Sequence, residues 1–334
     1  MTLPPAVLAN GGAFSERRPG GPTSGGGVIQ ATAVQLGAQI LTRIGHTPLL
    51  ALPVINREVP HVTLLAKAEW FNPGGSVKDR AAASIVADAE TRGVLTRDTI
   101  LLDATSGNTG VAYAMIGAAK GYRVTLCVPS NASPEILRTM KAYGATLILT
   151  NPLEGSDGAI REARRVAAAH PTRYYYADQY SNAANWQAHD RTTGVEIWEQ
   201  THGAVTHLIA GLGTSGTLMG TGRRLKAFNP AVQAIAVQPD SPLHGLEGLK
   251  HMAASIVPGI YDATFPDRQM EVATEEAYQM VKRLAADEGM LVGISAGAAL
   301  AAGLRIAAEL RSGTIVMIFP DNGTRYLDEQ FWEK

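Results

Sequence analysis

Lys78 stands where a lysine is electrostatically unfavourable. It lies in the segment 72–80 (NPGGSVKDR), in the first turn of a helix that Ser76 opens. Because the N-terminus of a helix carries the positive end of its dipole, a cation placed there calls for a reason. A lysine that forms a Schiff base supplies one, since it must be neutral to react and desolvation near positive potential lowers its pKa. The alternative is an ordinary solvated lysine.

A glycine loop joins an apolar strand to a helix within 207–222 (HLIAGLGTSGTLMGTG). It contains G-x-G-x-x-G, the dinucleotide fingerprint, and Asp240 follows the next strand, where a ribose contact needs an acidic residue. A NAD-dependent dehydrogenase is therefore one hypothesis, and a tight turn that binds nothing is another. The hydroxyls of Thr214, Ser215 and Thr217 favour a monophosphate, because they can donate to its oxygens, whereas a pyrophosphate loop relies mainly on backbone N–H groups.

A second strand-to-helix junction, 103–110 (DATSGNTG), crowds polar side chains at the start of a helix. N-capping by Ser106 or Asn108 accounts for one of them. A docked carboxylate uses all four, which are Thr105, Ser106, Asn108 and Thr109. A phosphate loop, a poised lysine and a carboxylate-sized group of donors do not suit hydride transfer. Together they indicate an amino acid carried on pyridoxal phosphate.

The elements that must position these residues alternate along the chain. Short apolar strands are predicted at 62–68, 99–103, 123–128, 145–149, 206–210, 232–237 and 314–319. Helical patterns lie near 76–92, 109–120, 133–143, 157–169, 214–227, 274–288 and 297–311, with a further helix over 32–44. Wholly apolar strands between helices predict an α/β fold with open, mostly parallel sheets covered on both faces.

Composition excludes several classes of function. The 334 residues carry 29 basic and 30 acidic side chains without a basic stripe, which argues against nucleic acid as a partner. No apolar stretch has the length of a membrane helix, and residues 1–30 lack the pattern of a signal peptide. The single cysteine, Cys127, predicts a buried inert thiol and a reducing, cytoplasmic location. The eight histidines lack metal-ligand spacing, so no metal is expected.

Many motifs in one order give the chain a resemblance to a known family. Over residues 38–328 it resembles the fold-type II pyridoxal-phosphate enzymes, which share the fold of the tryptophan synthase β-subunit, and most closely the cysteine synthases (O-acetylserine sulfhydrylases). The matching motifs are IGHTPLL, NPGGSVKDRAA, ATSGNTGVAYA, GYRVTLCVPSNAS, YGATLILT, DQYSNAANWQAH, TTGVEIW, GLGTSGTLMGTGRRLK, GISAGAAL and PDNGTRYL.

The resemblance implies a role for each matching residue. Lys78 is similar to the Schiff-base lysine, and Asn108 to the asparagine beside the 3′ oxygen of the cofactor. Ser295, which alone is more typical of a helix cap, matches the serine that faces the pyridine nitrogen, an arrangement that suits β-elimination better than transamination. The 5′-phosphate loop corresponds to Gly213, Thr214, Ser215, Gly216 and Thr217. The substrate-carboxylate site corresponds to Thr105, Ser106, Gly107, Thr109 and Gln179.

The reaction implied by the resemblance is a β-replacement. A cysteine synthase, a transferase, makes L-cysteine from O-acetyl-L-serine and sulfide through an α-aminoacrylate intermediate, and its lysine removes and returns the α-proton. A homodimer is expected from the family. An S-sulfocysteine synthase, a cystathionine β-synthase, a serine or threonine dehydratase and a non-catalytic binding module remain as alternatives. Thr109-Gly110 after Asn108 favours the synthase over a dehydratase.

The segment 238–260 bears on the choice of donor. It lacks the G-I-G-x-G-F pattern of A-type cysteine synthases and is closer to the B-type isozyme, although Pro320 and Asn322 depart from one B-type form. It contains no arginine to pair with a substrate phosphate and offers as cations only Lys250, His244 and His251. Because a buried dianion needs a cation, we expect O-acetyl-L-serine to be preferred over O-phospho-L-serine by more than about tenfold in kcat/KM.

The expected organisation has four parts. Residues 1–30 are predicted to form a flexible Gly/Pro-rich tail, and 31–57 a helix and crossover that pack on the large domain. Residues 58–155 form a smaller, mobile domain with the carboxylate loop, and 156–334 a larger domain with the phosphate loop.

Overall fold

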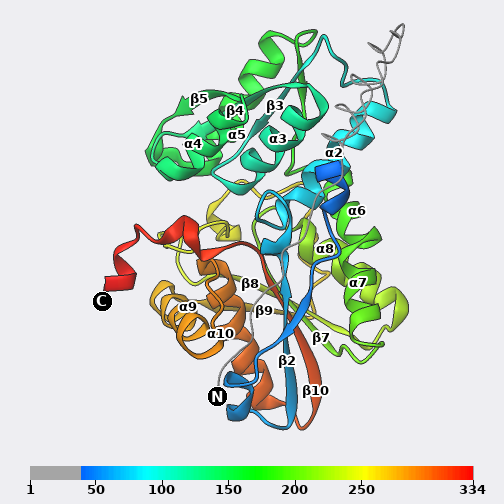
Figure 1. The fold of residues 1–334 in the computed structure, drawn as a ribbon, viewed down its shortest axis with the longest axis vertical. Coiled ribbons are helices and arrows are strands. Elements are labelled where there is room, and N and C mark those ends of the chain that lie inside the picture. Colours follow the sequence, from blue (N-terminus) through cyan, green and yellow to red (C-terminus); the bar gives the residue numbers. More distant parts are fainter. Residues whose placement is uncertain (1–38, 334) are drawn as a thin grey trace, which may run out of the picture. The chain divides into compact units, whose positions relative to one another are not determined.

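Ten strands in two sheets carry the fold in the computed structural model, which describes residues 39–333. The six-stranded sheet has the order β1 (Leu49–Ala51), β2 (Val62–Ala68), β10 (Gly313–Phe319), β7 (His207–Gly211), β8 (Gln233–Pro239) and β9 (Arg268–Val272). The four-stranded sheet has the order β5 (Thr146–Thr150), β4 (Arg123–Pro129), β3 (Ile100–Ala104) and β6 (Tyr174–Tyr176) (Figure 1).

Both sheets are mostly parallel, because helices connect most of their strands. Every pair is parallel except β1 with β2, which are antiparallel. The seven predicted strands are confirmed. The sequence missed β1 and β6, which have three residues each, and β9, whose alternating exposed and buried residues are typical of an edge strand.

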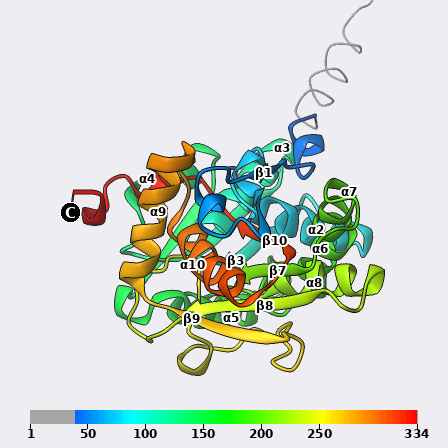
Figure 2. The ribbon, with the colours of Figure 1, turned by 90° about the horizontal axis from the view of Figure 1, so that it is seen from below.

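Helices cover both faces of each sheet. The helices are α2 (Lys78–Thr91), α3 (Asn108–Lys120), α4 (Pro134–Ala142), α5 (Gly155–Ala169), α6 (Ala183–Arg191), α7 (Thr193–Gln200), α8 (Gly216–Phe228), α9 (Thr274–Glu288) and α10 (Ile294–Glu309). On one face of the six-stranded sheet, α9 and α10 pack against each other and fill a core with the strands (Figure 2), and α7 and α8 fill the core of the other face. In the four-stranded sheet, α2, α3 and α4 share one core and α5 the other.

The helix α6 and its successor α7 were not predicted. The two helices (AANWQAHDR and TGVEIWEQ) bury polar residues such as Asn185, His189 and Glu196. Their sequences therefore lack the apolar stripe by which a helix is predicted. The other seven helices of the described chain match the predicted ranges to within a few residues.

The predicted domain boundaries do not coincide with the two sheets. The strand β2, from the expected 58–155 domain, pairs with β10, and β6, from the expected 156–334 domain, pairs with β3. Independent movement of two domains stays a prediction. The predicted tail 1–30 lies outside the described residues, as does most of the predicted helix 32–44, of which the short 3-10 helix Ile40–Arg43 is described.

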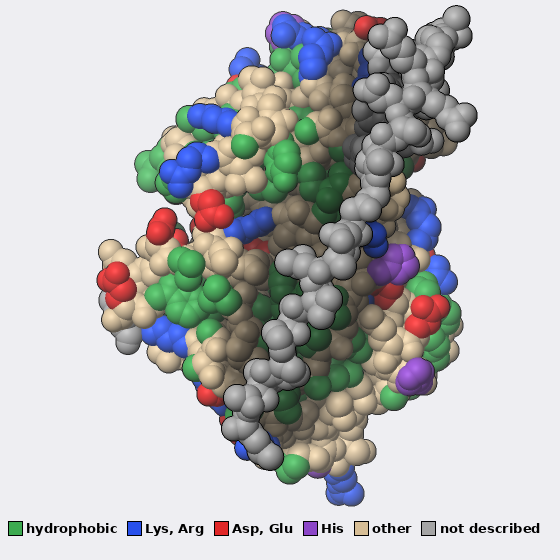
Figure 3. Space-filling view, in the orientation of Figure 1, with side chains coloured by type: hydrophobic (Ala, Val, Ile, Leu, Met, Phe, Trp, Pro, Cys, Tyr) green, Lys and Arg blue, Asp and Glu red, His purple; other side chains and the backbone are tan. Residues whose placement is uncertain are grey.

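Three expectations drawn from composition can be compared with the structure: mixed surface charge, no membrane helix and a buried cysteine. Figure 3 shows acidic and basic side chains interspersed over the visible face. Within residues 39–333, no helix combines the length and hydropathy needed to cross a membrane. Cys127 is buried, and burial raises its pKa to about 12, as expected for an inert thiol.

Candidate active site

The chemistry-bearing segments meet at the carboxyl ends of the parallel strands. The loops after β2, β3, β7 and β10 line two adjoining pockets, which share Lys78, Asn108, Gly213 and Thr214. Ligands of open α/β sheets bind at this edge because the loops and the helix N-termini converge there. Lys78 and Thr217 line the same pocket, as expected if one cofactor spans them.

Lys78 is the first residue of α2, and hydrogen bonds of the backbone around it fix its position next to the end of β10. The backbone N–H of Val77 donates to the carbonyl of Pro320 at 2.8 Å, and the N–H of Lys78 donates to Ser76 Oγ at 3.3 Å. Burial lowers the pKa of Lys78, and the carboxylates of Asp321 and Glu69 oppose this effect. The amine is therefore closer to its neutral, reactive form than a solvated lysine is.

The glycine loop between β7 and α8 turns sharply. Ser215 has φ 68°, in the left-handed region, and its buried Oγ has no hydrogen-bond partner among the described residues. Thr214 Oγ1 accepts from Asn185 Nδ2 at 3.1 Å and from the N–H of Gly216 at 3.3 Å. A Cβ on Gly213 would lie 2.4 Å from the carbonyl oxygen of Gly248, so only glycine fits there. A strained backbone and an unpartnered hydroxyl are typical of a binding loop.

Two residues of the fingerprint lie apart from the pockets. Gly216 lines neither pocket, and a Cβ there would lie 2.0 Å from Asn185 Oδ1, so this glycine permits the packing of α8 on α6. Asp240 is exposed and also lines neither pocket. The acidic residue required by the dehydrogenase hypothesis is therefore not at the site.

The junction between β3 and α3 is organised by Thr105 and Gln179. The side chain of Thr105 accepts from the N–H groups of Gly107 and Gly110 at 3.0 and 3.1 Å, while the N-cap itself is Gly107, so neither Ser106 nor Asn108 caps the helix. Thr109 Oγ1 donates to Gln179 Oε1 at 2.8 Å, and Gln179 Nε2 donates to the carbonyl of Ala104 at 2.7 Å. With Ser106 exposed at the mouth, all five predicted carboxylate-site residues line one pocket.

The polar atoms that lack partners fit a phosphate-bearing pyridine. Ser215 Oγ and Asn108 Oδ1 are buried without a partner in the described chain, and Ser295, 6% exposed, lines the pocket that contains Lys78 and Thr217. Burying such groups unpaired is costly, which favours a polar ligand between them. Hydroxyl and helix N–H groups gather at the glycine loop, where a phosphate can bind. The amide of Asn108 and the amine of Lys78 line the same pocket, as the binding of pyridoxal phosphate requires.

Lys250 is the cation of the 238–260 segment that lines the pocket. It is 6% exposed, its Nζ lies 2.6 Å from Asp157 Oδ1, and it stands over the ring of Tyr180 at 5.2 Å from the centroid. The same carboxylate accepts from the N–H of Ile256 at 2.7 Å. Lys250 therefore already has a counter-ion. His244 and His251 do not line this pocket.

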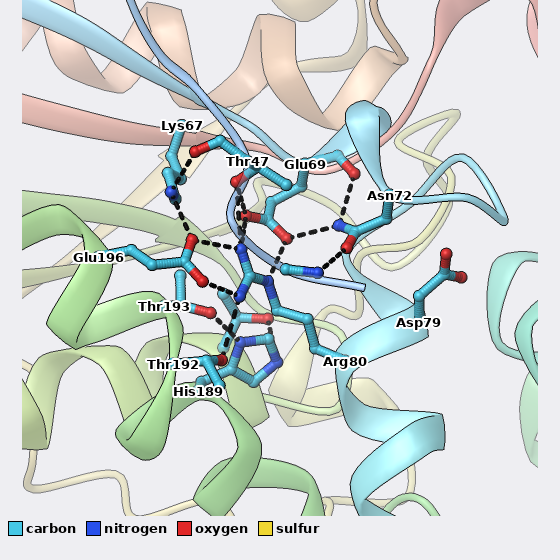
Figure 4. A network of polar contacts seen from close by, with 12 residues as sticks. Thr47, Lys67, Glu69, Asn72, Asp79, Arg80, His189, Thr192, Thr193 and Glu196 are labelled. Carbon is cyan, nitrogen blue, oxygen red and sulfur yellow. Dashed lines mark hydrogen bonds and ion pairs between the residues drawn. The ribbon is translucent and has the colours of Figure 1, made fainter. Parts of the chain in front are cut away.

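Arg80, two residues after Lys78 in α2, belongs to a buried ion network (Figure 4). Arg80 donates to Glu69 from Nε at 2.7 Å and to Glu196 from Nη1 at 2.6 Å. Lys67 Nζ adds a contact of 2.7 Å to Glu196. Burial alone would raise the pKa of both glutamates, but Arg80 holds them below the usual value. The network fixes the helix turn that carries Lys78.

Sequence reasoning missed several residues around the pockets, including four with titratable side chains. They are Asp321, Tyr326, Glu247 and His189, and the first three line a pocket. His189, which the spacing of the histidines indicated to be structural or exposed, is buried and lies 3.3 Å from Thr217 Oγ1, and burial lowers its pKa to about 3. The motifs PDNGTRYL and DQYSNAANWQAH contain Asp321, Tyr326 and His189, but their local pattern does not indicate which side chains face a pocket.

Comparison with known proteins agrees with this geometry. The chain is 52% identical to the cysteine synthase of Aquifex aeolicus over 294 residues, which cover 86% of this chain and 90% of that protein. It is 42% identical to cysteine synthase B of Pseudomonas aeruginosa, with 87% and 96% covered. The crystal structure of cysteine synthase from Entamoeba histolytica superposes with a TM-score of 0.83 at 38% identity, over 88% of this chain and 90% of that one. Residues 40–321 match the family described as pyridoxal-phosphate dependent enzyme. The chain belongs to this family of pyridoxal-phosphate dependent enzymes.

Proposed function

We propose that the chain makes L-cysteine from O-acetyl-L-serine and sulfide by β-replacement. The observation that carries this proposal is the placement of Lys78 between the glycine loop and the carboxylate loop in adjoining pockets. The curated relatives named cysteine synthase, at 52% and 42% identity, support it. We propose that Gly213, Thr214, Ser215, Gly216 and Thr217 hold the phosphate of the cofactor, with Gly216 contributing its backbone at the start of α8.

Bound pyridoxal phosphate supplies an electron sink for the α-carbon of the amino acid. The residues of the chain hold and move the rest. The N–H groups of Asn108 and Thr109, which the first turn of α3 leaves free, bind the substrate carboxylate together with the second amide proton of Gln179. The hydroxyl of Thr109 orients Gln179 by donating to its Oε1. Lys78 Nζ, whose pKa burial lowers, takes the α-proton and later returns it. Ser295, which lines the pocket with Lys78, would hold the ring side of the cofactor with a hydroxyl rather than a carboxylate, which suits departure of a group from the β-carbon.

The charge of the pocket favours a donor whose ester group is neutral. Lys250, the cation of the 238–260 segment that lines the pocket, is neutralised by Asp157 at 2.6 Å. Because an acetyl ester is neutral and a phosphate ester is a dianion, O-acetyl-L-serine needs no further cation and O-phospho-L-serine does. We therefore keep O-acetyl-L-serine as the proposed donor. A homodimer and a cytoplasmic location are also proposals.

The test is cysteine formation from O-acetyl-L-serine and sulfide by the chain loaded with pyridoxal phosphate. We expect the wild type to show a visible absorbance band that borohydride bleaches, and Lys78→Ala to lose both the band and the turnover. Lys141→Ala, which removes an exposed lysine on α4, is the matched control and should behave as the wild type. Near-normal cysteine synthesis by Lys78→Ala would refute the mechanism.

A further inference from the structure

Asp321 is a buried carboxylate at the point where three loops of the site meet. It directly follows Pro320 after β10, is 1% exposed, and lines the pocket that contains Lys78 and Ser295. Its backbone pairs with Ser76 in an isolated bridge, and its carbonyl accepts from the N–H of Gly293 at 3.0 Å. The residue therefore touches the segment before α2 and the segment before α10.

The side chain of Asp321 holds Asn108 in one orientation. Asn108 Nδ2 donates to Asp321 Oδ2 at 2.7 Å, and the hydroxyl of Tyr326 donates to the same oxygen at 2.6 Å. An asparagine amide nitrogen has two protons, so this contact leaves the second proton for another acceptor. Asn108 Oδ1 and Asp321 Oδ1 are both buried without a hydrogen-bond partner in the described part of the chain.

The position of the carboxylate also matters for charge. A Cβ on Gly293 would lie 1.9 Å from Asp321 Oδ1, which places this oxygen directly against the backbone where α10 begins. The N-terminus of a helix favours negative charge. The carboxylate of Asp321 raises the pKa of Lys78 against the larger effect of burial. A negative group in this pocket favours the positively charged form of a nitrogen at Lys78.

We propose that Asp321 is a positioning residue of the cofactor site. It fixes the amide of Asn108 so that one N–H is directed at the cofactor, and it is the counter-ion of the nitrogen of Lys78. This inference rests on the proposed function, because it requires pyridoxal phosphate in the pocket.

The experiment compares Asp321→Asn with the wild type and with Asp240→Asn. Asparagine keeps the shape of Asp321 and removes its charge. Asp240→Asn is the control, because it removes the same charge at the same edge of the sheet. Asp240 lies just after β8, is exposed and lines neither pocket. Two quantities are measured: the Kd of the cofactor-free enzyme for pyridoxal phosphate, and the pH midpoint of the visible absorbance band of the loaded enzyme.

The expected changes follow from the two contacts. Loss of the charge-assisted bond to Asn108 should weaken cofactor binding about tenfold. Loss of the negative charge should lower the pH midpoint by about 1, because the positive form at Lys78 loses its counter-ion. The other titratable and charged groups around the site are the same in both proteins; they are Glu69, Asp79, Arg80, His189, Glu247 and Arg325. In an Asn108→Ala background, Asp321→Asn should not weaken cofactor binding further, because the effect acts through that amide.

Each outcome decides the inference. An unchanged midpoint in folded Asp321→Asn would overturn it, as would an equal shift in Asp240→Asn. If Asp321→Asn does not fold, Asp321→Ser replaces it with the same expected directions, and failure of both to fold would overturn the inference by placing Asp321 among residues that the fold requires. A wild type without the absorbance band or cysteine synthesis contradicts the proposed function instead, whatever Asp321→Asn does.

Discussion

Arg80→Met is expected to destabilise the protein strongly while leaving the shape of α2 intact. Arg80 is 3% exposed and binds Glu69 and Glu196 through both oxygens of each carboxylate, with four distances between 2.6 and 2.9 Å. Lys67 also contacts Glu196, so two cations balance two carboxylates in the network. Methionine fills much of the volume but leaves one buried negative charge without a partner.

The magnitude follows from the burial of the pair. Removing one partner of a buried, hydrogen-bonded ion pair costs about 3–5 kcal/mol, because the other charge stays buried. Glu69 keeps bonds from Thr47 Oγ1 at 2.7 Å and Asn72 Nδ2 at 2.9 Å, which favours the lower end of that range. The matched control is Arg92→Met, at the exposed end of the same helix, where the ion pair with Asp88 is worth at most about 1 kcal/mol.

The loss should also depend on pH. In the wild type, Arg80 holds the pKa of Glu69 below its usual value, so the stabilisation is present above the pKa of the unfolded chain. In Arg80→Met, burial dominates and raises the pKa of Glu69, so the native state binds more protons than the unfolded one and its stability falls as pH rises. The difference between the two proteins is therefore larger at mildly alkaline than at mildly acidic pH.

The assay is urea unfolding of the cofactor-free proteins at both pH values, followed by circular dichroism, so that cofactor affinity does not enter the comparison. Glu69→Gln in the Arg80→Met background should restore part of the stability, because it removes the unpaired charge. A loss below about 1 kcal/mol, comparable with the control, would refute the reasoning. A loss independent of pH would show that packing, not charge, holds α2.

Two further predictions concern single carboxylates. Asp157→Asn frees the charge of Lys250, so the kcat/KM ratio of O-phospho-L-serine to O-acetyl-L-serine should rise about tenfold or more from a wild-type value that favours the acetyl ester; an unchanged ratio in parallel assays of both donors contradicts this. Asp79→Asn should gain stability relative to the wild type as pH rises, because burial raises the pKa of Asp79 to about 7 and its native state holds a proton that the unfolded state has lost. The gain accumulates between about pH 4 and pH 7, where it reaches about 4 kcal/mol and then stays constant; urea unfolding at mildly acidic and at mildly alkaline pH measures it, and identical pH dependence of the two proteins contradicts it.

Local sequence pattern was enough to predict most of the strands and several residues of the candidate site. Apolar runs such as 62–68 and 314–319 predicted strands, because the residues of a strand buried on both faces are apolar regardless of their partners. Lys78 after its glycine turn and the hydroxyls of 213–217 indicated an amine and a phosphate loop, because both depend on a helix N-terminus that the neighbouring residues specify. The strands β1, β6 and β9 and the helices α6 and α7 lacked such a pattern, since their burial comes from distant segments.

Tertiary structure decided which of these groups meet. The bond between Asn108 and Asp321 joins residues 213 positions apart, and the pair of Lys250 and Asp157 joins residues 93 positions apart. No local pattern encodes such contacts, because they arise only when strands from distant segments align in one sheet and bring their loops to one edge. The same alignment places β2 beside β10 rather than beside its neighbour in sequence, β3. Local sequence therefore predicted the candidate reacting groups, and the packing of the sheets determined their charge partners.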